Sequence, residues 1–244
     1  MAFVLQLLRR IVRRFKTLRR VAAHVRFWSD FQAQAMLKLE RLGPPNLLQP
    51  SGYTVPDRYP QIFSIVSLLL REVSEPRLLS YGCSVGDEIV ALSRYVPTAH
   101  ITGVDILPWN IVKAEKKTRD LKNISLYVAD WPDKCSQDHF DAVFCMAVLR
   151  HKAIAATVPL CCKDILSFEQ FARFVAILAR CVRVGGYLII WNSQFRFRDT
   201  EAFSQFEIVY REPTLSLQNT PVYGVNSELL IGQRYEEAIF RKTR

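Results

Sequence analysis

The sequence predicts an α/β protein with a doubly wound, mostly parallel seven-stranded sheet and an N-terminal helical extension. Short apolar runs alternate with helical patterns from residue 76 onward, which is typical of βαβ units with right-handed crossovers. The chain has 244 residues, of which 50% are hydrophobic, so it can bury one sizeable core. We therefore expect a basic amphipathic extension and linker over residues 1–55, followed by one folded domain over residues 56–244.

The extension carries most of the positive charge. The net charge is +10, and the first 29 residues hold seven arginines, one lysine and no acidic residue, which leaves about +2 for the rest. Apolar residues recur there at steps of four and three, on one helical face: Val4, Leu8, Ile11, Phe15, Leu18, Ala22 and Val25. The opposite face is basic and carries Arg9, Arg13, Lys16 and Arg20. This pattern is typical of helices that lie in anionic membrane interfaces.

Three interpretations of residues 1–28 stay open. They are a surface helix that packs on its own domain or on a partner, a helix that binds an anionic membrane surface, and a mitochondrial targeting segment. The uncharged run of residues 1–8 is too short to span a bilayer. A secretory signal is disfavoured because the basic residues follow the apolar run instead of preceding it.

The cysteines indicate the compartment. They lie mostly in apolar runs and form no CxxC motif or zinc-type spacing: Cys83, Cys135, Cys145, Cys161, Cys162 and Cys181. We expect free thiols in a reducing compartment and no metal site. The predicted location is cytoplasmic, with peripheral membrane contact if residues 1–28 bind a membrane.

The elements follow in order. A helix is expected to close the extension before Gly43, and the next to start near Asp57, with Pro60 in its first turn. Strands are predicted at residues 77–81, 100–106, 124–130, 140–146 and 186–192, with a closing, antiparallel pair at 207–210 and 236–242. Helices are predicted at residues 85–95, 109–119 and 167–183. The last should begin with a capping box of Ser167 and Gln170, and Gly185 and Gly186 should turn the chain back into a strand.

Ligands of open parallel sheets bind beyond the carboxyl ends of the strands, where four loops of this chain should converge. The first loop is a glycine turn, "GCSVG" at residues 82–86, whose glycines permit a close backbone approach and positive φ. Asp105 follows the second strand and suits the hydroxyls of a ribose. Asp130 follows the third and could accept from an exocyclic amine. Ile106 and Trp131 offer apolar faces to a purine, so the four loops predict an adenosine pocket.

Each feature has a simpler explanation when taken alone. A glycine turn is often needed only to reach the next helix, and a lone aspartate at a strand end is often a helix cap. The joint occurrence of these features, in this order, favours the ligand pocket.

The order of motifs resembles that of class I S-adenosylmethionine-dependent methyltransferases. The resemblance covers residues 77–192 through "LLSYGCSVGDE", "ITGVDI", "LYVADW", "FDAVFCMAVL" and "LARCVRVGGYLII", and "GCSVGDE" is similar to the first motif of chemotaxis-receptor-type methyltransferases. It implies a Rossmann-like methyltransferase fold with S-adenosylmethionine as cofactor. It also implies cofactor contacts: Gly82, Cys83, Ser84 and Gly86 at the methionine part, Asp105 at the ribose, Ile106 on the adenine, and Asp130 with Trp131 at the adenine edge. "FDAVFCM" would line the methionine end beside the methyl group.

The chain departs from the family pattern at two positions. The family has an acidic residue two positions before the first glycine, where this chain has Ser80, and a glycine where it has Ser84. Asp87 or Glu88 are the candidates to replace the missing carboxylate. The departures keep a second interpretation open, a catalytically inactive methyltransferase-fold binding or scaffold protein.

An NAD-dependent oxidoreductase is a third and weaker interpretation. The glycine spacing is not GxGxxG, and Asp87 would lie unfavourably close to a pyrophosphate.

Methyl transfer from a sulfonium is an in-line displacement that depends mainly on alignment, so no catalytic base is assigned. His151 is interpreted as a residue at the start of a helix. The loop before the sheet could form a lid or an acceptor wall, with Tyr53, Asp57, Arg58 and Tyr59. The near-neutral domain shows no basic stripe with interleaved aromatics, and no "NPPY"-like run follows the fourth strand. A small-molecule, saccharide or lipid-linked acceptor is therefore expected in preference to nucleic acid, and the sequence indicates no oligomeric state.

Overall fold

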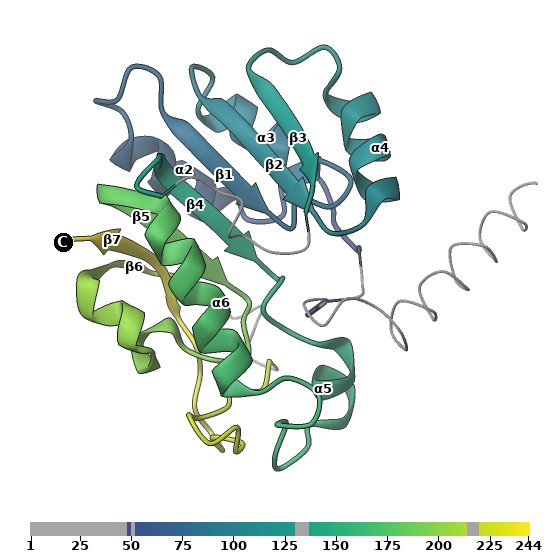
Figure 1. Ribbon diagram of the computed structural model, residues 1–244, viewed down its shortest axis with the longest axis vertical. Coiled ribbons are helices and arrows are strands. Elements are labelled where there is room, and N and C mark those ends of the chain that lie inside the picture. The colour runs from purple at the N-terminus through teal and green to yellow at the C-terminus, as the bar shows by residue number, and fades with distance from the viewer. Residues whose placement is uncertain (1–47, 50–51, 130–136, 214–219) are drawn as a thin grey trace, which may run out of the picture. The chain divides into compact units, whose positions relative to one another are not determined.

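The computed structural model describes residues 48–49, 52–129, 137–213 and 220–244 (Figure 1). The amphipathic extension, Cys135, Asp130 and Trp131 lie outside these ranges. Within them, no helix combines the length and the apolar character needed to cross a bilayer.

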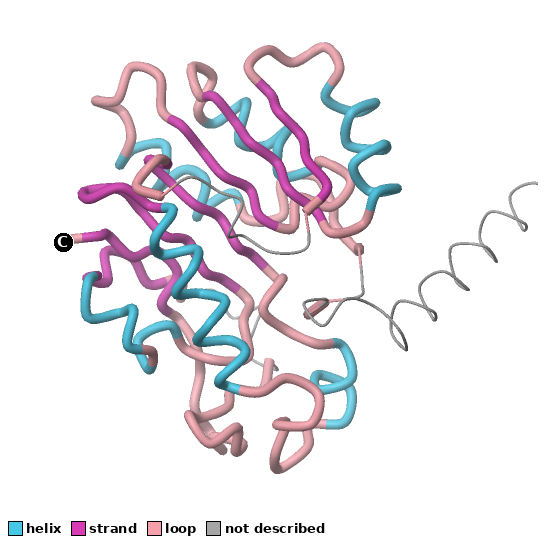
Figure 2. The backbone as a smooth tube through the Cα atoms, viewed as in Figure 1, coloured by secondary structure: helices cyan, strands magenta, loops and turns pink. Residues whose placement is uncertain are grey.

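Seven strands form one sheet in the order β3-β2-β1-β4-β5-β7-β6 (Figures 1 and 2). Strands β1 to β5 are parallel to one another, and β7 is antiparallel to both β5 and β6. The bounds are β1 Arg77–Tyr81, β2 His100–Asp105, β3 Ile124–Val128, β4 Phe140–Met146, β5 Val182–Trp191, β6 Phe206–Arg211 and β7 Glu237–Lys242. The predicted fold class is confirmed.

Helices cover both faces of the sheet. They are α2 Pro60–Leu69, α3 Asp87–Tyr95, α4 Pro108–Thr118, α5 Lys152–Thr157 and α6 Phe168–Cys181, with short 3₁₀ turns η2 Phe197–Asp199 and η3 Glu201–Gln205. Successive strand residues point to opposite faces. Leu78 therefore packs with α2, α3 and α4, whereas Leu79 packs with α6. Every residue of β4 is buried, as expected of a central strand covered on both faces.

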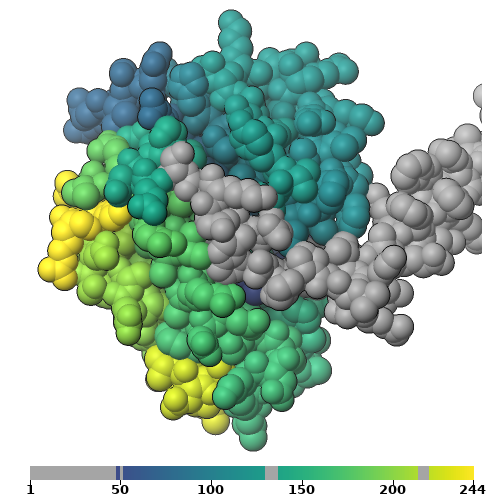
Figure 3. All heavy atoms as spheres, viewed as in Figure 1, coloured from purple at the N-terminus to yellow at the C-terminus, as the bar shows by residue number. Residues whose placement is uncertain are grey.

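Residues distant in the sequence form one continuous surface. Figure 3 shows the blue and teal residues of the first half of the domain beside the green and yellow residues of the second half. The two halves meet because β1 pairs in parallel with β4, which places the carboxyl ends of early and late strands at the same edge of the sheet.

Two boundaries differ from the sequence prediction. Helix α2 begins at Pro60, not near Asp57, because Asp57 has a φ of +51° and proline needs no N–H partner at the first helical position. Strand β5 begins at Val182, directly after α6, so the prediction that Gly185 and Gly186 separate helix from strand is wrong. Gly185, with a φ of +80°, lies inside β5 where the register with β4 shifts.

Two local predictions have clear outcomes. The capping box at Ser167 is confirmed, since its hydroxyl accepts from the Gln170 N–H and the Gln170 side chain accepts from the Ser167 N–H. The short helix α5, which follows β4, was not predicted, because its six residues are too few to show a helical period.

Candidate active site

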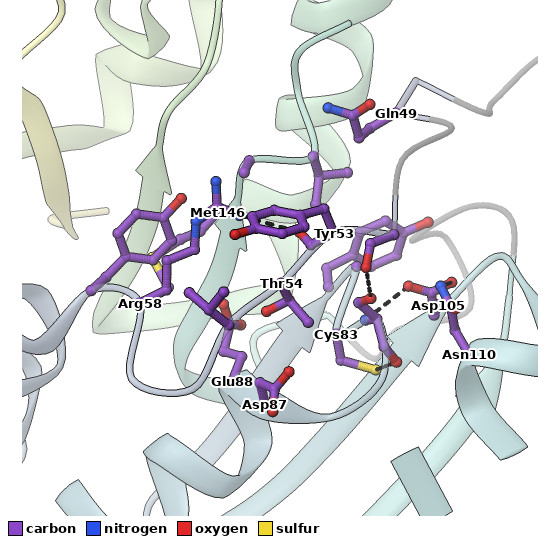
Figure 4. A pocket seen from close by; sticks show the side chains of 18 of the residues that line it. Gln49, Tyr53, Thr54, Arg58, Cys83, Asp87, Glu88, Asp105, Asn110 and Met146 are labelled. Atoms are coloured by element: carbon purple, nitrogen blue, oxygen red, sulfur yellow. Dashed lines mark hydrogen bonds between the residues drawn. The ribbon is translucent and has the colours of Figure 1, made fainter. Parts of the chain in front are cut away.

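A pocket lies at the carboxyl ends of β1, β2 and β4, and residues 52–59 line another of its sides (Figure 4). The space between the walls, counted out to the open mouth, is about 910 Å³.

The glycine turn after β1 is shaped by contacts on its far side. Gly82 has a φ of +77°, and a Cβ there would lie 2.3 Å from a methyl group of Val148. Gly86 has a φ of +89°, caps α3, and would place a Cβ 3.1 Å from Ala114 of α4. Both positions therefore require glycine whatever the pocket holds.

The sequence-predicted residues of this turn have different positions. Gly82, Cys83 and Ser84 line the pocket. The Cys83 side chain is buried in the core on the α3 side, so Cys83 presents its backbone to the pocket. Gly86 is buried against α4 and directs the start of α3.

Asp105, at the end of β2, is buried and accepts three hydrogen bonds. One of its carboxylate oxygens accepts from the Leu107 N–H (2.9 Å) and from Asn110 Nδ2 (3.1 Å), and the other accepts from the Ser84 N–H (2.9 Å). Burial raises the pKa of Asp105, and these three hydrogen bonds oppose the rise. A carboxylate has about four acceptor sites, so Asp105 retains one for a ligand hydroxyl.

A second carboxylate enters the pocket wall from α3. Ser80 donates its hydroxyl proton to Glu88 Oε1 at 2.6 Å, which places the Glu88 carboxyl group beside the end of β1. Burial raises the pKa of Glu88 to about 7, against the opposing effects of Ser80 and of the Arg58 charge. Asp87 instead pairs with Lys117 of α4. Of the two candidates to replace the missing carboxylate, Glu88 is thus the one beside Ser80.

Residues 52–59 fold over the glycine turn. The Ser84 hydroxyl donates to the Gly52 carbonyl at 2.8 Å. The Arg58 guanidinium lies 5.8 Å from the ring centroid of Tyr53 and 5.2 Å from that of Tyr59, so the cation is held between two aromatic rings. This segment is the wall that the sequence analysis suggested for a lid or an acceptor.

The end of β4 forms the side of the pocket beside Arg58, and Asn192 after β5 contacts Tyr59 of that wall. Ala147 lines the pocket with a φ of +59°, a strained conformation that concentrates at functional sites. Asn192, also at positive φ, donates from Nδ2 to the Tyr59 hydroxyl at 3.3 Å, and its Oδ1 accepts from Arg150. Burial raises the pKa of Tyr59, which keeps the phenol protonated at neutral pH.

The remaining predicted residues are placed as follows. Ile106 is half-buried in the pocket wall beside Asp105. The interpretation of His151 as a residue at the start of a helix is confirmed, because it caps α5 through its Nδ1, which accepts from the Ala153 N–H at 3.2 Å. Asn110 was not identified from the sequence, although its place in the first turn after Asp105 was a usable signal.

Comparison with known proteins gives the family. A family model described as "Methyltransferase domain" matches residues 72–216. An uncharacterized protein of Synechococcus sp. is 28% identical over 120 residues, which cover 44% of this chain and 28% of that protein. One of Rickettsia prowazekii is 28% identical over 105 residues, covering 41% and 19%. The matches thus span less than a third of these relatives.

Solved structures with a related fold include two methyltransferases. The N-methyltransferase NodS from Bradyrhizobium japonicum has a TM-score of 0.49 at 16% identity, covering 77% of this chain and 99% of NodS. An S-adenosylmethionine-dependent methyltransferase from Geobacter sulfurreducens, in complex with S-adenosylhomocysteine, has a TM-score of 0.41 at 16% identity, covering 75% and 59%.

The family match covers more than half of the chain, and the sheet order and the pocket agree with it. The chain therefore belongs to the class I S-adenosylmethionine-dependent methyltransferases, with S-adenosylmethionine as cofactor. The resemblance drawn from residues 77–192 is confirmed at the level of the family.

Proposed function

We propose that the protein transfers the methyl group of S-adenosylmethionine to a small molecule, a saccharide or a lipid-linked compound. The observation that carries this proposal is the wall of residues 52–59, which narrows the pocket beside the cofactor turn. The near-neutral charge after residue 29 also disfavours a nucleic-acid acceptor, since phosphate backbones are bound by basic surfaces.

The described residues fit the cofactor. The backbone of residues 82–84 can approach the methionine part, and the remaining acceptor site of Asp105 suits one ribose hydroxyl. Ile106 supports the adenine, a contact proposed from the sequence together with Asp130 and Trp131. Glu88 supplies the carboxylate that Ser80 cannot, and we assign it to the ammonium group of the cofactor. Gly86 lies on the side of the turn that faces α4, where it caps α3.

The chain's own contribution to the reaction is alignment and exclusion of water. S-adenosylmethionine supplies an electrophilic methyl group on a sulfonium. The side chains that narrow the acceptor side are Arg58, Tyr59 and Met146, of which Tyr59 is fixed by Asn192. When a site excludes water and holds donor and acceptor in the geometry for transfer, this alignment alone can accelerate the reaction greatly, without a dedicated base.

The first test is a calorimetric titration of the full-length protein with S-adenosylmethionine and S-adenosylhomocysteine, with NAD as control. We expect micromolar dissociation constants for the first two and no binding of NAD. Asp105→Ala should weaken binding at least tenfold, because a charged hydrogen-bond partner is lost, whereas Asp120→Ala at an exposed site should not. Absence of binding by folded wild-type protein would refute the proposal. A positive result leads to a screen of acceptor classes with a labelled methyl group.

We further propose that residues 1–28 bind an anionic membrane surface and so bring the site to lipid-linked acceptors. The support is the sequence pattern, with an apolar stripe opposite a basic face. Full-length protein should sediment with phosphatidylserine vesicles. Substitution of Arg9, Arg13, Lys16 and Arg20 by glutamine should abolish sedimentation, whereas Arg71→Gln should not. A wild-type protein that stays in the supernatant would contradict the proposal.

A further inference from the structure

Arg58 in the pocket wall and Arg150 after β4 have no ion pair with any of the residues that the structure describes. Among the described residues, neither Arg58 nor Arg150 has a carboxylate within 4.0 Å. Other arginines without an ion pair, such as Arg94 and Arg180, are exposed to solvent, whereas Arg58 and Arg150 are half-buried. The Arg58 charge acts at longer range on the Glu88 carboxyl group, whose pKa it lowers, and Arg58 donates to the Tyr53 carbonyl at 3.4 Å. A half-buried charge without a close ion pair is costly, so an anion bound at these guanidinium groups would be stabilised.

Arg58 contacts Tyr59 directly, and Arg150 is linked to it through Asn192. Arg58 lies over the ring of Tyr59, and Arg150 is connected to the Tyr59 hydroxyl through the two ends of the Asn192 amide. The pKa of Arg150 is lowered mainly by burial, and the charge of Arg58 acts in the same direction. The two cations therefore repel each other across a shared neighbour, and an anion between them would relieve the repulsion.

The position is the end of the pocket away from the proposed ribose contact. Figure 4 shows Arg58 beside Met146 at one end, and Asp105 with Asn110 at the other. Tyr59 lines this end, and its protonated hydroxyl accepts from Asn192, which leaves its own proton free to be donated. Arg58 and Tyr59 in the pocket wall, with the Arg150 charge on the other side of the Asn192 amide, form a set suited to a carboxylate or a phosphate.

We propose that Arg58 and Arg150 bind an anionic group, a carboxylate or a phosphate, carried by the methyl acceptor. This inference rests on the proposed function and narrows its substrate class to acidic acceptors. The methionine carboxylate of the cofactor is the second source of the same chemistry, and the experiment separates the two.

The probe is inorganic phosphate, titrated at constant ionic strength into full-length protein saturated with S-adenosylhomocysteine. Phosphate should raise the unfolding temperature with a half-maximal concentration on the order of millimolar. Arg58→Gln and Arg150→Gln should each raise that concentration about tenfold or more, since a charged donor is lost. Glutamine at position 150 retains an amide donor for Asn192, which limits structural damage. Arg94→Gln is the matched exposed control.

The contrary outcomes are distinct. An unfolding temperature that does not respond to phosphate with either S-adenosylhomocysteine or 5′-methylthioadenosine bound, or that responds equally in wild type and both variants, would overturn the anion site. The titration is then repeated with 5′-methylthioadenosine, which lacks the carboxylate and the amine. If S-adenosylhomocysteine blocks phosphate and 5′-methylthioadenosine does not, the cofactor carboxylate occupies the site and the acceptor assignment is wrong. Equal phosphate binding with either ligand supports it. Failure of wild type to bind S-adenosylhomocysteine would instead refute the proposed function.

Discussion

Glu88→Gln separates a ligand-binding carboxylate from a structural one. Glutamine has the same shape and still accepts the hydrogen bond of the Ser80 hydroxyl, so the substitution removes mainly the charge. Burial raises the pKa of Glu88 from 4.5 to about 7, whereas its carboxyl group has an ordinary pKa in the unfolded chain. The charged carboxylate therefore lowers the free energy of unfolding, and the glutamine variant avoids this loss.

The sign and size of the stability effect follow from this pKa. Below pH 4.5 the carboxyl group is protonated in both states and contributes no pH dependence. As pH rises from 4.5 to about 7, the unfolded chain loses the proton first and stability falls. Above pH 7 the accumulated cost is about 3 kcal/mol. Glu88→Gln should therefore be more stable than wild type by up to about 3 kcal/mol at pH 8, with a much smaller difference at pH 5.

Ligand binding should change in the opposite sense. If the ionised carboxylate binds the ammonium group, affinity of wild type for S-adenosylhomocysteine should rise about tenfold between pH 6 and pH 8, as the ionised fraction rises from about a tenth to nine-tenths. The variant should bind about tenfold more weakly at pH 8 and show no such slope. The other groups that interact with Glu88 stay in one charge state over this range, since Arg58 is a cation and the pKa values of Tyr59, Cys83 and Cys145 are raised.

The assays are urea unfolding at pH 5 and pH 8 and calorimetric titration across the same range. Glu115→Gln, at an exposed site on α4, is the matched control. Binding of 5′-methylthioadenosine, which lacks the amine, should be independent of both pH and the substitution. Wild-type affinity in the variant at pH 8 would refute the assignment. A loss of turnover with unchanged affinity would assign Glu88 to proton transfer instead.

Three further substitutions test the architecture around the site. Gly82→Ala should lower the free energy of unfolding by about 2–4 kcal/mol, measured in urea, because φ is positive and Val148 blocks the new Cβ; adding Val148→Ala should restore only the part due to the clash. Asn110→Ala removes one donor from Asp105 and should weaken S-adenosylhomocysteine binding about threefold to tenfold by calorimetry. Ser167→Ala should cost about 1 kcal/mol through the lost cap of α6 and leave that binding unchanged.

The sequence predicted the strand positions well because each strand of this sheet is a short apolar run with polar or glycine-containing boundaries. Its failures have local causes. A glycine pair normally indicates a break between elements. Gly185 and Gly186 instead continue β5 where its register with β4 shifts. The start of α2 was misplaced because Asp57 resembles a cap, whereas its φ of +51° places it in the preceding turn.

The site was predictable to the extent that it depends on topology. The rule that ligands bind at the carboxyl ends of parallel strands placed Gly82, Asp105 and Ile106 around one pocket without any knowledge of side-chain contacts. The contact between Asn192 and Tyr59 joins residues 133 positions apart, and no spacing in the chain indicates it.

The Ser80–Glu88 pair shows that a carboxylate expected at one position of a family motif can be supplied from another position that is close to it in space. A carboxylate at the end of β1 and one in the first turn of α3 reach the same region, because the glycine turn brings that helix back over the strand. The helix position has an electrostatic advantage, since carboxylates near a helix N-terminus are stabilised by its dipole. The first turn of α3 holds two acidic residues, Asp87 and Glu88, and Asp87 forms an ion pair with Lys117. Glu88 has no such partner among the described residues, so its charge remains available for a cationic ligand, which is the property that the proposed cofactor contact requires.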